Sequence, residues 1–113
     1  DKIGSMSGHE FAQKLAEGSL TTPLDVRKES EYLSEHVVGV ENFPLDFIHD
    51  NFAEIDPNKE YTLHCASGYR SLVAASIFQA NGVKNVTDVR GGFADIKAAE
   101  APLTDYVCPT TLL

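Results

Sequence analysis

Short strand-like segments alternate with helix-like segments along this sequence, and no hairpin dipeptide joins neighbouring strands. Short apolar runs predict strands at 23–27, 61–64 and 83–89, with a further short strand or turn at 37–40. Apolar residues with helical spacing predict helices at 7–17, 30–33, 47–55, 70–80 and 93–98. Parallel strands need long crossover connections, which are usually helices. The alternation therefore predicts an α/β domain with a mainly parallel sheet.

Two of the predicted helices carry capping residues at their ends. Ser7 and Glu10 match a capping box at the start of the first helix, and Gly18 suits its end. Asn81 and Gly82 form a similar stop signal after the helix at 70–80. These residues locate the helix boundaries to within a few positions.

The composition is that of an ordinary globular domain. The chain has 113 residues, of which 42% are hydrophobic and 23% are charged, and we expect one domain over 1–113. The net charge of −8, with scattered Lys and Arg, disfavours a nucleic-acid partner. No apolar run reaches membrane-spanning length and no signal-peptide pattern opens the chain, so we expect no membrane partner and a cytoplasmic location. Because the chain starts at Asp1 without a methionine, we expect it to be a fragment of a longer protein.

Cysteine and histidine usage gives no sign of a metal site or of a disulfide scaffold. The two cysteines, Cys65 and Cys108, do not form the dense framework of a small secreted domain, although a bond between them stays open. The four histidines have no metal-ligand spacing with each other or with the cysteines. We expect neither a metal nor another cofactor.

The segment at 64–71, His-Cys-Ala-Ser-Gly-Tyr-Arg-Ser, is the clearest functional signal. It predicts a strand, a tight loop and a helix, with Cys65 where the strand ends. Backbone N–H groups at a helix N-terminus and the cation of Arg70 would favour a negatively charged sulfur. Reactive groups of parallel sheets lie at the carboxyl ends of the strands. The acids and arginines at 25–27 and 88–90 are expected to end their strands at that same edge.

Four motifs in this order resemble those of a rhodanese-like (sulfurtransferase) domain over about residues 6–100, with a tail at 101–113. They are Leu-Asp-Val-Arg at 24–27 with Glu-Tyr at 31–32, the segment 36–45, Cys-Ala-Ser-Gly-Tyr-Arg-Ser at 65–71, and Gly-Gly-Phe at 91–93. The resemblance implies a rhodanese-like sheet of about five mainly parallel strands, flanked by helices on both faces.

The resemblance also implies a sulfurtransferase reaction at Cys65. The thiolate would take a sulfane sulfur from a donor to form a persulfide, and a thiol or cyanide acceptor would then remove the outer sulfur. The loop that would hold the persulfide consists of Ala66, Ser67, Gly68, Tyr69, Arg70 and Ser71. Gly68 would allow its tight path, and Arg70 would buttress the loop, with an acidic group as its candidate partner. Asp25 and Arg27 are expected to support the rim through ion pairs, with Arg27 reaching Glu31.

Three departures from the family pattern bear on this reaction. Ala66 stands where thiosulfate-using members often carry a basic residue, which favours a persulfide donor over thiosulfate. Glu35 replaces a common glycine and is expected to be tolerated at the surface. Phe93 is expected to be an apolar anchor within the closing glycine motif.

Two other functions stay open. A cysteine-dependent phosphatase or arsenate reductase is disfavoured, because only four residues separate Cys65 from Arg70 where phosphate loops have five. A non-catalytic persulfide carrier or accessory domain is the second alternative. The tail at 105–113 resembles the end of rhodanese domains fused to a metallo-β-lactamase-like persulfide dioxygenase, so an N-terminal hydrolase domain is a candidate partner.

The remaining residues of interest are assigned structural roles. Cys108 is expected to be a bystander, with a resolving thiol as the alternative. His36 is expected to be a hydrogen-bonded structural histidine. His64 is expected to point away from Cys65, because neighbouring strand side chains alternate between the two faces.

Overall fold

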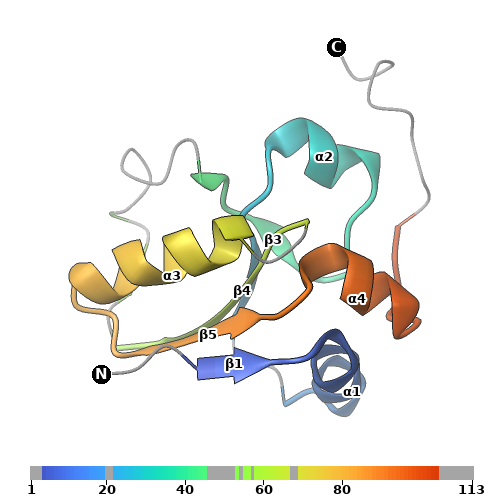
Figure 1. Ribbon diagram of the computed structural model, residues 1–113, viewed down its shortest axis with the longest axis horizontal. Coiled ribbons are helices and arrows are strands. Elements are labelled where there is room, and N and C mark those ends of the chain that lie inside the picture. The colour runs from blue at the N-terminus through green and yellow to red at the C-terminus, as the bar shows by residue number, and fades with distance from the viewer. Residues whose placement is uncertain are drawn as a thin grey trace.

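Five parallel strands form one sheet in the order β1-β5-β4-β2-β3 (Figure 1). The structure is a computed structural model, and it describes residues 4–19, 22–45, 53, 55–56, 58–66 and 69–104. The strands are β1 (Gly4–Met6), β2 (Pro23–Asp25), β3 (Glu41–Asn42), β4 (Glu60–His64) and β5 (Asn85–Val89). The predicted five-stranded parallel sheet is confirmed.

Helices cover both faces of this sheet, as predicted. They are α1 (Gly8–Glu17), α2 (Glu29–Ser34), α3 (Tyr69–Ala80) and α4 (Gly92–Ala98). Figure 1 shows α3 along one face, with α1 and α4 side by side on the other. None of the helices in the described ranges is long and apolar enough to cross a membrane.

The two faces of β4 belong to different halves of the core. Leu63 and Cys65 pack with Phe78 of α3, whereas His64 lies against the Phe11 ring of α1, with ring centroids 5.3 Å apart. On that second face, Phe11 packs in one cluster with Ile96 of α4. Alternate side chains of a strand point to opposite faces, and residues 61–64 are buried on both faces of β4. This arrangement confirms that His64 points away from Cys65.

Ser7 and Gly18 cap α1 as predicted, although the structure shows only the Ser7 half of the predicted capping box. Ser7 Oγ accepts a hydrogen bond from the Glu10 backbone N–H at 3.1 Å, which satisfies one free donor of the first turn of α1. Gly18 ends the helix with φ 75°, a left-handed conformation that suits glycine.

The strands at 23–27, 61–64 and 83–89 and the helices at 7–17, 30–33, 70–80 and 93–98 are all present, with shifted ends. The sequence did not predict either edge strand, β1 or β3. Residues 37–40 form a turn with an isolated antiparallel bridge between Val37 and Leu103. Most of the predicted helix at 47–55 and the tail at 105–113, with Cys108, lie outside the described residues.

Candidate functional site

The candidate site lies at the carboxyl ends of the central strands. Cys65 directly follows β4, whose neighbours in the sheet are β2 and β5. Asp25 is the last residue of β2 and pairs in register with His64, and Asp88 is the penultimate residue of β5. The predicted gathering of these strand ends at one edge is confirmed.

Cys65 is completely buried, and its sulfur faces the start of α3. Cys65 Sγ lies 3.6 Å from the hydroxyl oxygen of Ser71, which in turn hydrogen-bonds Oδ1 of Asp88. The helix N-terminus beside the sulfur atom favours negative charge on that sulfur. This environment suits a sulfur nucleophile.

The described members of the predicted loop have different surroundings. The carbonyl of Ala66 accepts a hydrogen bond from Ala94 at 3.4 Å, whereas the Tyr69 side chain is 75% exposed. The prediction that Ser67 and Gly68 also form the loop falls on positions outside the described residues.

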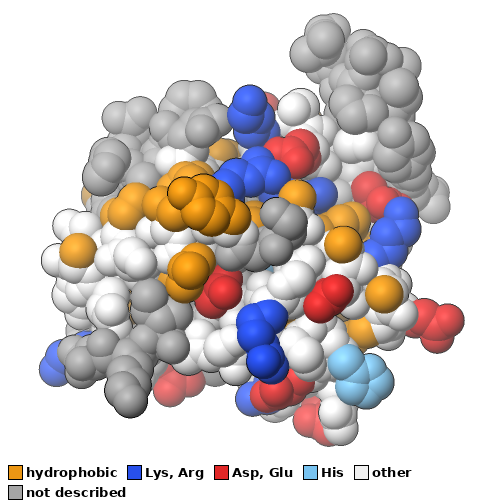
Figure 2. Space-filling model, viewed as in Figure 1, with side chains coloured by type: hydrophobic (Ala, Val, Ile, Leu, Met, Phe, Trp, Pro, Cys, Tyr) orange, Lys and Arg blue, Asp and Glu red, His pale blue; other side chains and the backbone are white. Residues whose placement is uncertain are grey.

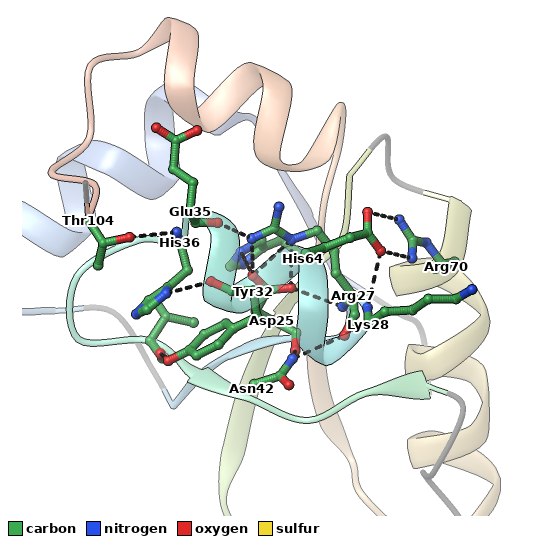
Figure 3. A network of polar contacts seen from close by, with 12 residues as sticks. Asp25, Arg27, Lys28, Tyr32, Glu35, His36, Asn42, His64, Arg70 and Thr104 are labelled. Carbon is green, nitrogen blue, oxygen red and sulfur yellow. Dashed lines mark hydrogen bonds and ion pairs between the residues drawn. The ribbon is translucent and has the colours of Figure 1, made fainter. Parts of the chain in front are cut away.

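Arg70 has an acidic partner, as predicted, and that partner is Glu31 of α2. Two parallel hydrogen bonds, Nη1 to Oε1 at 2.7 Å and Nη2 to Oε2 at 3.1 Å, join the two side chains (Figure 3). These bonds raise the pKa of Arg70, with the nearby Cys65 adding to the effect, and they lower the pKa of Glu31. Arg70 therefore remains cationic, but its charge is largely compensated.

The prediction that Arg27 reaches Glu31 is wrong. Arg27 instead forks onto Asp25, with Nε to Oδ1 at 3.0 Å and Nη2 to Oδ2 at 2.7 Å, and it also donates to the Glu35 carbonyl at 2.7 Å. The physical reason is burial: both Asp25 and Arg27 are enclosed, and each satisfies the charge of the other. Figure 3 shows Asn42 beside this pair, where its amide donates to both backbone carbonyls.

The ionised form of Asp25 is strongly favoured. Burial raises the pKa of this carboxyl, but the neighbouring His64 and Arg27 side chains outweigh burial and lower the pKa to about 2. His64 Nε2 lies 3.5 Å from Asp25 Oδ2, which is longer than the bonds from Arg27. Arg27 is therefore the stronger partner.

Helix α4 connects this ion pair to the backbone of Cys65. The Arg27 guanidinium lies 4.1 Å from the centre of the Phe93 ring, and the Phe93 N–H donates to the Cys65 carbonyl at 2.5 Å. Gly92 has φ 58°, and a Cβ atom there would lie 2.3 Å from the Cys65 carbonyl oxygen. Only glycine fits this close approach. The role of Phe93 as an anchor is confirmed, since it links Arg27 to Cys65.

The other predicted structural residues lie outside the immediate surroundings of the sulfur. His36 stacks on Tyr32 at 3.7 Å between ring centroids, and its Nδ1 lies 2.8 Å from the Tyr32 carbonyl oxygen, which confirms a hydrogen-bonded structural role. Glu35, expected simply at the surface, is mostly covered and pairs with Lys97 at 3.0 Å.

Sequence reasoning missed the part that Asp88 takes in the site. Asp88 was noticed only as a strand end, yet it is buried and bonded to Ser71. The available signal was an acid at a core-facing strand position, two residues after the buried Val86.

The comparison with known protein families agrees with this geometry. The model of the rhodanese-like domain matches residues 7–99. The chain belongs to the rhodanese-like family. A crystal structure of a rhodanese-like domain protein from Staphylococcus aureus is 29% identical, with a TM-score of 0.76 over 83% of this chain and 91% of that one.

Two curated relatives carry names that refer to sulfur chemistry. YrkF of Bacillus subtilis, named as a candidate sulfur carrier protein, is 34% identical over 93 residues, which are 82% of this chain and 50% of YrkF. The thiosulfate sulfurtransferase PspE of Escherichia coli is 35% identical over 75 residues, which are 65% of this chain and 71% of PspE. The rhodanese-like chain spans about half the length of YrkF and of YqhL, a second Bacillus subtilis relative (50% and 56%).

Proposed function

We propose that this rhodanese-like chain is a sulfurtransferase that carries a sulfane sulfur on Cys65. The observation that carries the proposal is the position of the Cys65 sulfur at the end of β4, against Ser71 and the start of α3. The Phe93 N–H donates a hydrogen bond to the Cys65 carbonyl, and the Arg27 guanidinium, paired with Asp25, lies over the Phe93 ring. In this proposal Asp25 and Arg27 are positioning residues, because they act through Phe93.

The reaction consists of two displacements at sulfur. In the first, the Cys65 thiolate attacks the outer sulfur of the donor, a new S–S bond forms, and the remainder of the donor leaves as an anion. In the second, a thiolate or cyanide acceptor attacks the outer sulfur of the Cys65 persulfide, and the Cys65 thiolate is released. Both steps need stabilised negative charge at one position, which supports the hydroxyl and helix terminus as the relevant surroundings.

The charges around the site favour a persulfide donor over thiosulfate. Thiosulfate is a small dianion and needs uncompensated positive charge, whereas the Arg70 cation is already engaged by Glu31 and the neighbouring loop residue is Ala66. The nearby surface is partly apolar, with exposed Tyr69 and Leu72 on α3 (Figure 2). Such a surface suits a persulfide carried by a protein or by a small thiol.

The proposal is tested by measuring the intact mass after incubation with a persulfide donor. We expect one added sulfur atom on the wild type and on Cys108→Ser, and none on Cys65→Ser. Cys108→Ser is the matched control, since it removes a thiol and leaves Cys65 in place. A mass increase that persists in Cys65→Ser, or its absence from the wild type with every donor, would refute the proposal.

A persulfide carrier is the second candidate function. The complete burial of Cys65 favours it, because a buried persulfide is protected from small nucleophiles until a partner protein approaches. The name of YrkF is in line with this reading, and so is a role as an accessory domain in a longer chain. A carrier would form the persulfide but would turn over negligibly with cyanide or small thiols, whereas a sulfurtransferase would turn over with them.

The phosphatase alternative has less support. A phosphate loop needs an arginine that is free to bind two oxygen atoms of the substrate, but both terminal nitrogens of Arg70 already bond Glu31. We expect no release of phosphate from an aryl phosphate.

A further inference from the structure

The hydroxyl of Ser71 lies between a nucleophilic sulfur and a buried acid. Its oxygen is 3.6 Å from Cys65 Sγ and forms a short hydrogen bond to Asp88 Oδ1. Cys65 directly follows β4, Ser71 belongs to α3 and Asp88 belongs to β5, so the fold brings them together from separate parts of the chain. Cys65 and Ser71 are completely buried, and Asp88 is only 7% exposed.

A serine hydroxyl has one hydrogen, so it donates to one of these two neighbours at a time. When Asp88 is ionised, Ser71 donates to the carboxylate and faces Cys65 with its lone pairs, which suits the neutral S–H form. When Asp88 is protonated, the carboxylic acid can donate to Ser71, and Ser71 can donate to a Cys65 thiolate. The two arrangements have the same net charge and differ only in the positions of two hydrogens.

Burial of Asp88 brings the two arrangements closer in energy, because it disfavours the carboxylate. Burial raises the pKa of Asp88, and the hydrogen bond from Ser71 only partly offsets this effect. Arg70 lies within electrostatic range of Cys65, and Glu31 of α2 compensates part of its charge.

Among the described residues, the sheet neighbours of Asp88 carry no charge. The register partners of Asp88 are Ser5 on β1 and Leu63 on β4, and neither carries a charge. The charged or titratable side chains beneath β4 are Asp25, Arg27 and His64, and they lie on the opposite face of the sheet, toward α1 and α4.

We propose that Asp88 accepts the proton of Cys65 through the hydroxyl of Ser71. The S–H bond breaks as its proton moves to the Ser71 oxygen, and the original Ser71 hydrogen moves to Asp88 Oδ1. The products are a Cys65 thiolate and a neutral Asp88, with Ser71 unchanged and no charge lost to solvent. The purpose of this relay rests on the proposed sulfur transfer, since it prepares the thiolate for attack, but its test does not.

The first test follows the ultraviolet absorbance of the thiolate during a pH titration, in a Cys108→Ser background that leaves one cysteine. Two like charges roughly 6 Å apart, at an effective dielectric constant of about 20, separate two ionisations by about two pH units. We therefore expect the thiolate to appear in two steps, one for each proton that leaves the coupled pair, because both arrangements of the singly ionised pair contribute. Asp88→Asn, which is similar in shape and cannot ionise, should give a single step.

The infrared band of a protonated carboxyl provides the second readout. At neutral pH we expect this band in the Cys108→Ser protein and not in its Asp88→Asn variant. Alkylation of Cys65 with iodoacetamide removes the sulfur charge, so Asp88 should ionise and the band should disappear. A purely structural Asp88 would not respond to the state of Cys65.

The contribution of Ser71 is tested by two substitutions. Ser71→Ala removes the donor to the thiolate, and the first step should move to higher pH by about one to two units, the size of a charge-assisted hydrogen bond. Ser71→Thr keeps the hydroxyl and should restore the wild-type titration. The relay is overturned if Ser71→Ala and the wild type give the same thiolate titration. It is also overturned if the wild type shows a single titration step and no carboxyl band. A two-step titration in a protein that gains no sulfur in the mass measurement would uphold the relay and refute the sulfur transfer.

Discussion

Replacing Asp25 with asparagine preserves the shape of the side chain and removes the charge that holds Arg27. Arg27 is only 5% exposed, so the substitution leaves a buried guanidinium without its carboxylate. Breaking a buried ion pair by removing one partner costs about 3–5 kcal/mol. We expect the free energy of unfolding of Asp25→Asn at pH 7 to fall by about this amount.

The same charge makes the stability dependent on pH. The pKa of Asp25 is lowered from 3.8 to about 2 in the folded protein, so ionisation of Asp25 contributes about 2 kcal/mol of stability above pH 4. Because the folded pKa is the lower one, this contribution is lost as the pH falls from about 4 through 2. The difference in stability between the wild type and Asp25→Asn should therefore shrink by about 2 kcal/mol over that range.

Urea denaturation at a series of pH values measures this difference directly. Glu60→Gln, which removes an exposed carboxylate of β4, is the matched control and should follow the wild type at every pH. The double variant Asp25→Asn/Arg27→Met should be more stable than the sum of the two single losses predicts, because neither charge is then left alone. A gap between the wild type and Asp25→Asn that stays constant from pH 7 to acid would refute the reasoning.

Two further predictions concern the contacts of Cys65 and Arg70. Gly92→Ala places a Cβ atom 2.3 Å from the Cys65 carbonyl oxygen, so it should abolish sulfur transfer. It should also destabilise the fold by at least about 2 kcal/mol more than the control Gly39→Ala, a position with φ 88° but open space around it. Equal losses of stability in the two variants would contradict this prediction. Glu31→Gln should change the free energy of unfolding by less than about 1 kcal/mol, because the pair is partly exposed. It frees the charge of Arg70, so kcat/KM with thiosulfate should rise relative to a persulfide donor, and an unchanged ratio would show that this charge does not select the donor.

The local sequence pattern was sufficient to predict most of the helices and strands, but not the side-chain contacts of the candidate site. The helix at 70–80 has its own periodicity and stop signal, and it was predicted to within one residue of each end. By contrast, β1 is only three residues long and has no apolar alternation, so it depends on pairing with β5. Its existence followed from tertiary structure alone.

In the site too, features marked by neighbouring residues were predictable, whereas contacts between distant residues were not. Cys65 was recognisable because strand, loop and helix signals surround it in the sequence. The partner of Arg70 was not, since Glu31 lies 39 positions earlier and several nearby acids were equally plausible by spacing. Asp88 could have been found, because an acid facing the core of a strand must be bonded or neutral.

The hydrogen bond from Phe93 to the Cys65 carbonyl has a consequence for how the protein is made. The strand and helix that flank Cys65 precede α4 in the sequence, so they leave the ribosome before it. The thiol therefore exists in the nascent chain without the contact that fixes its backbone, and it acquires that contact only when the last helix is in place. We therefore expect the proposed reactivity toward sulfur donors to begin only after nearly the whole domain has been synthesised.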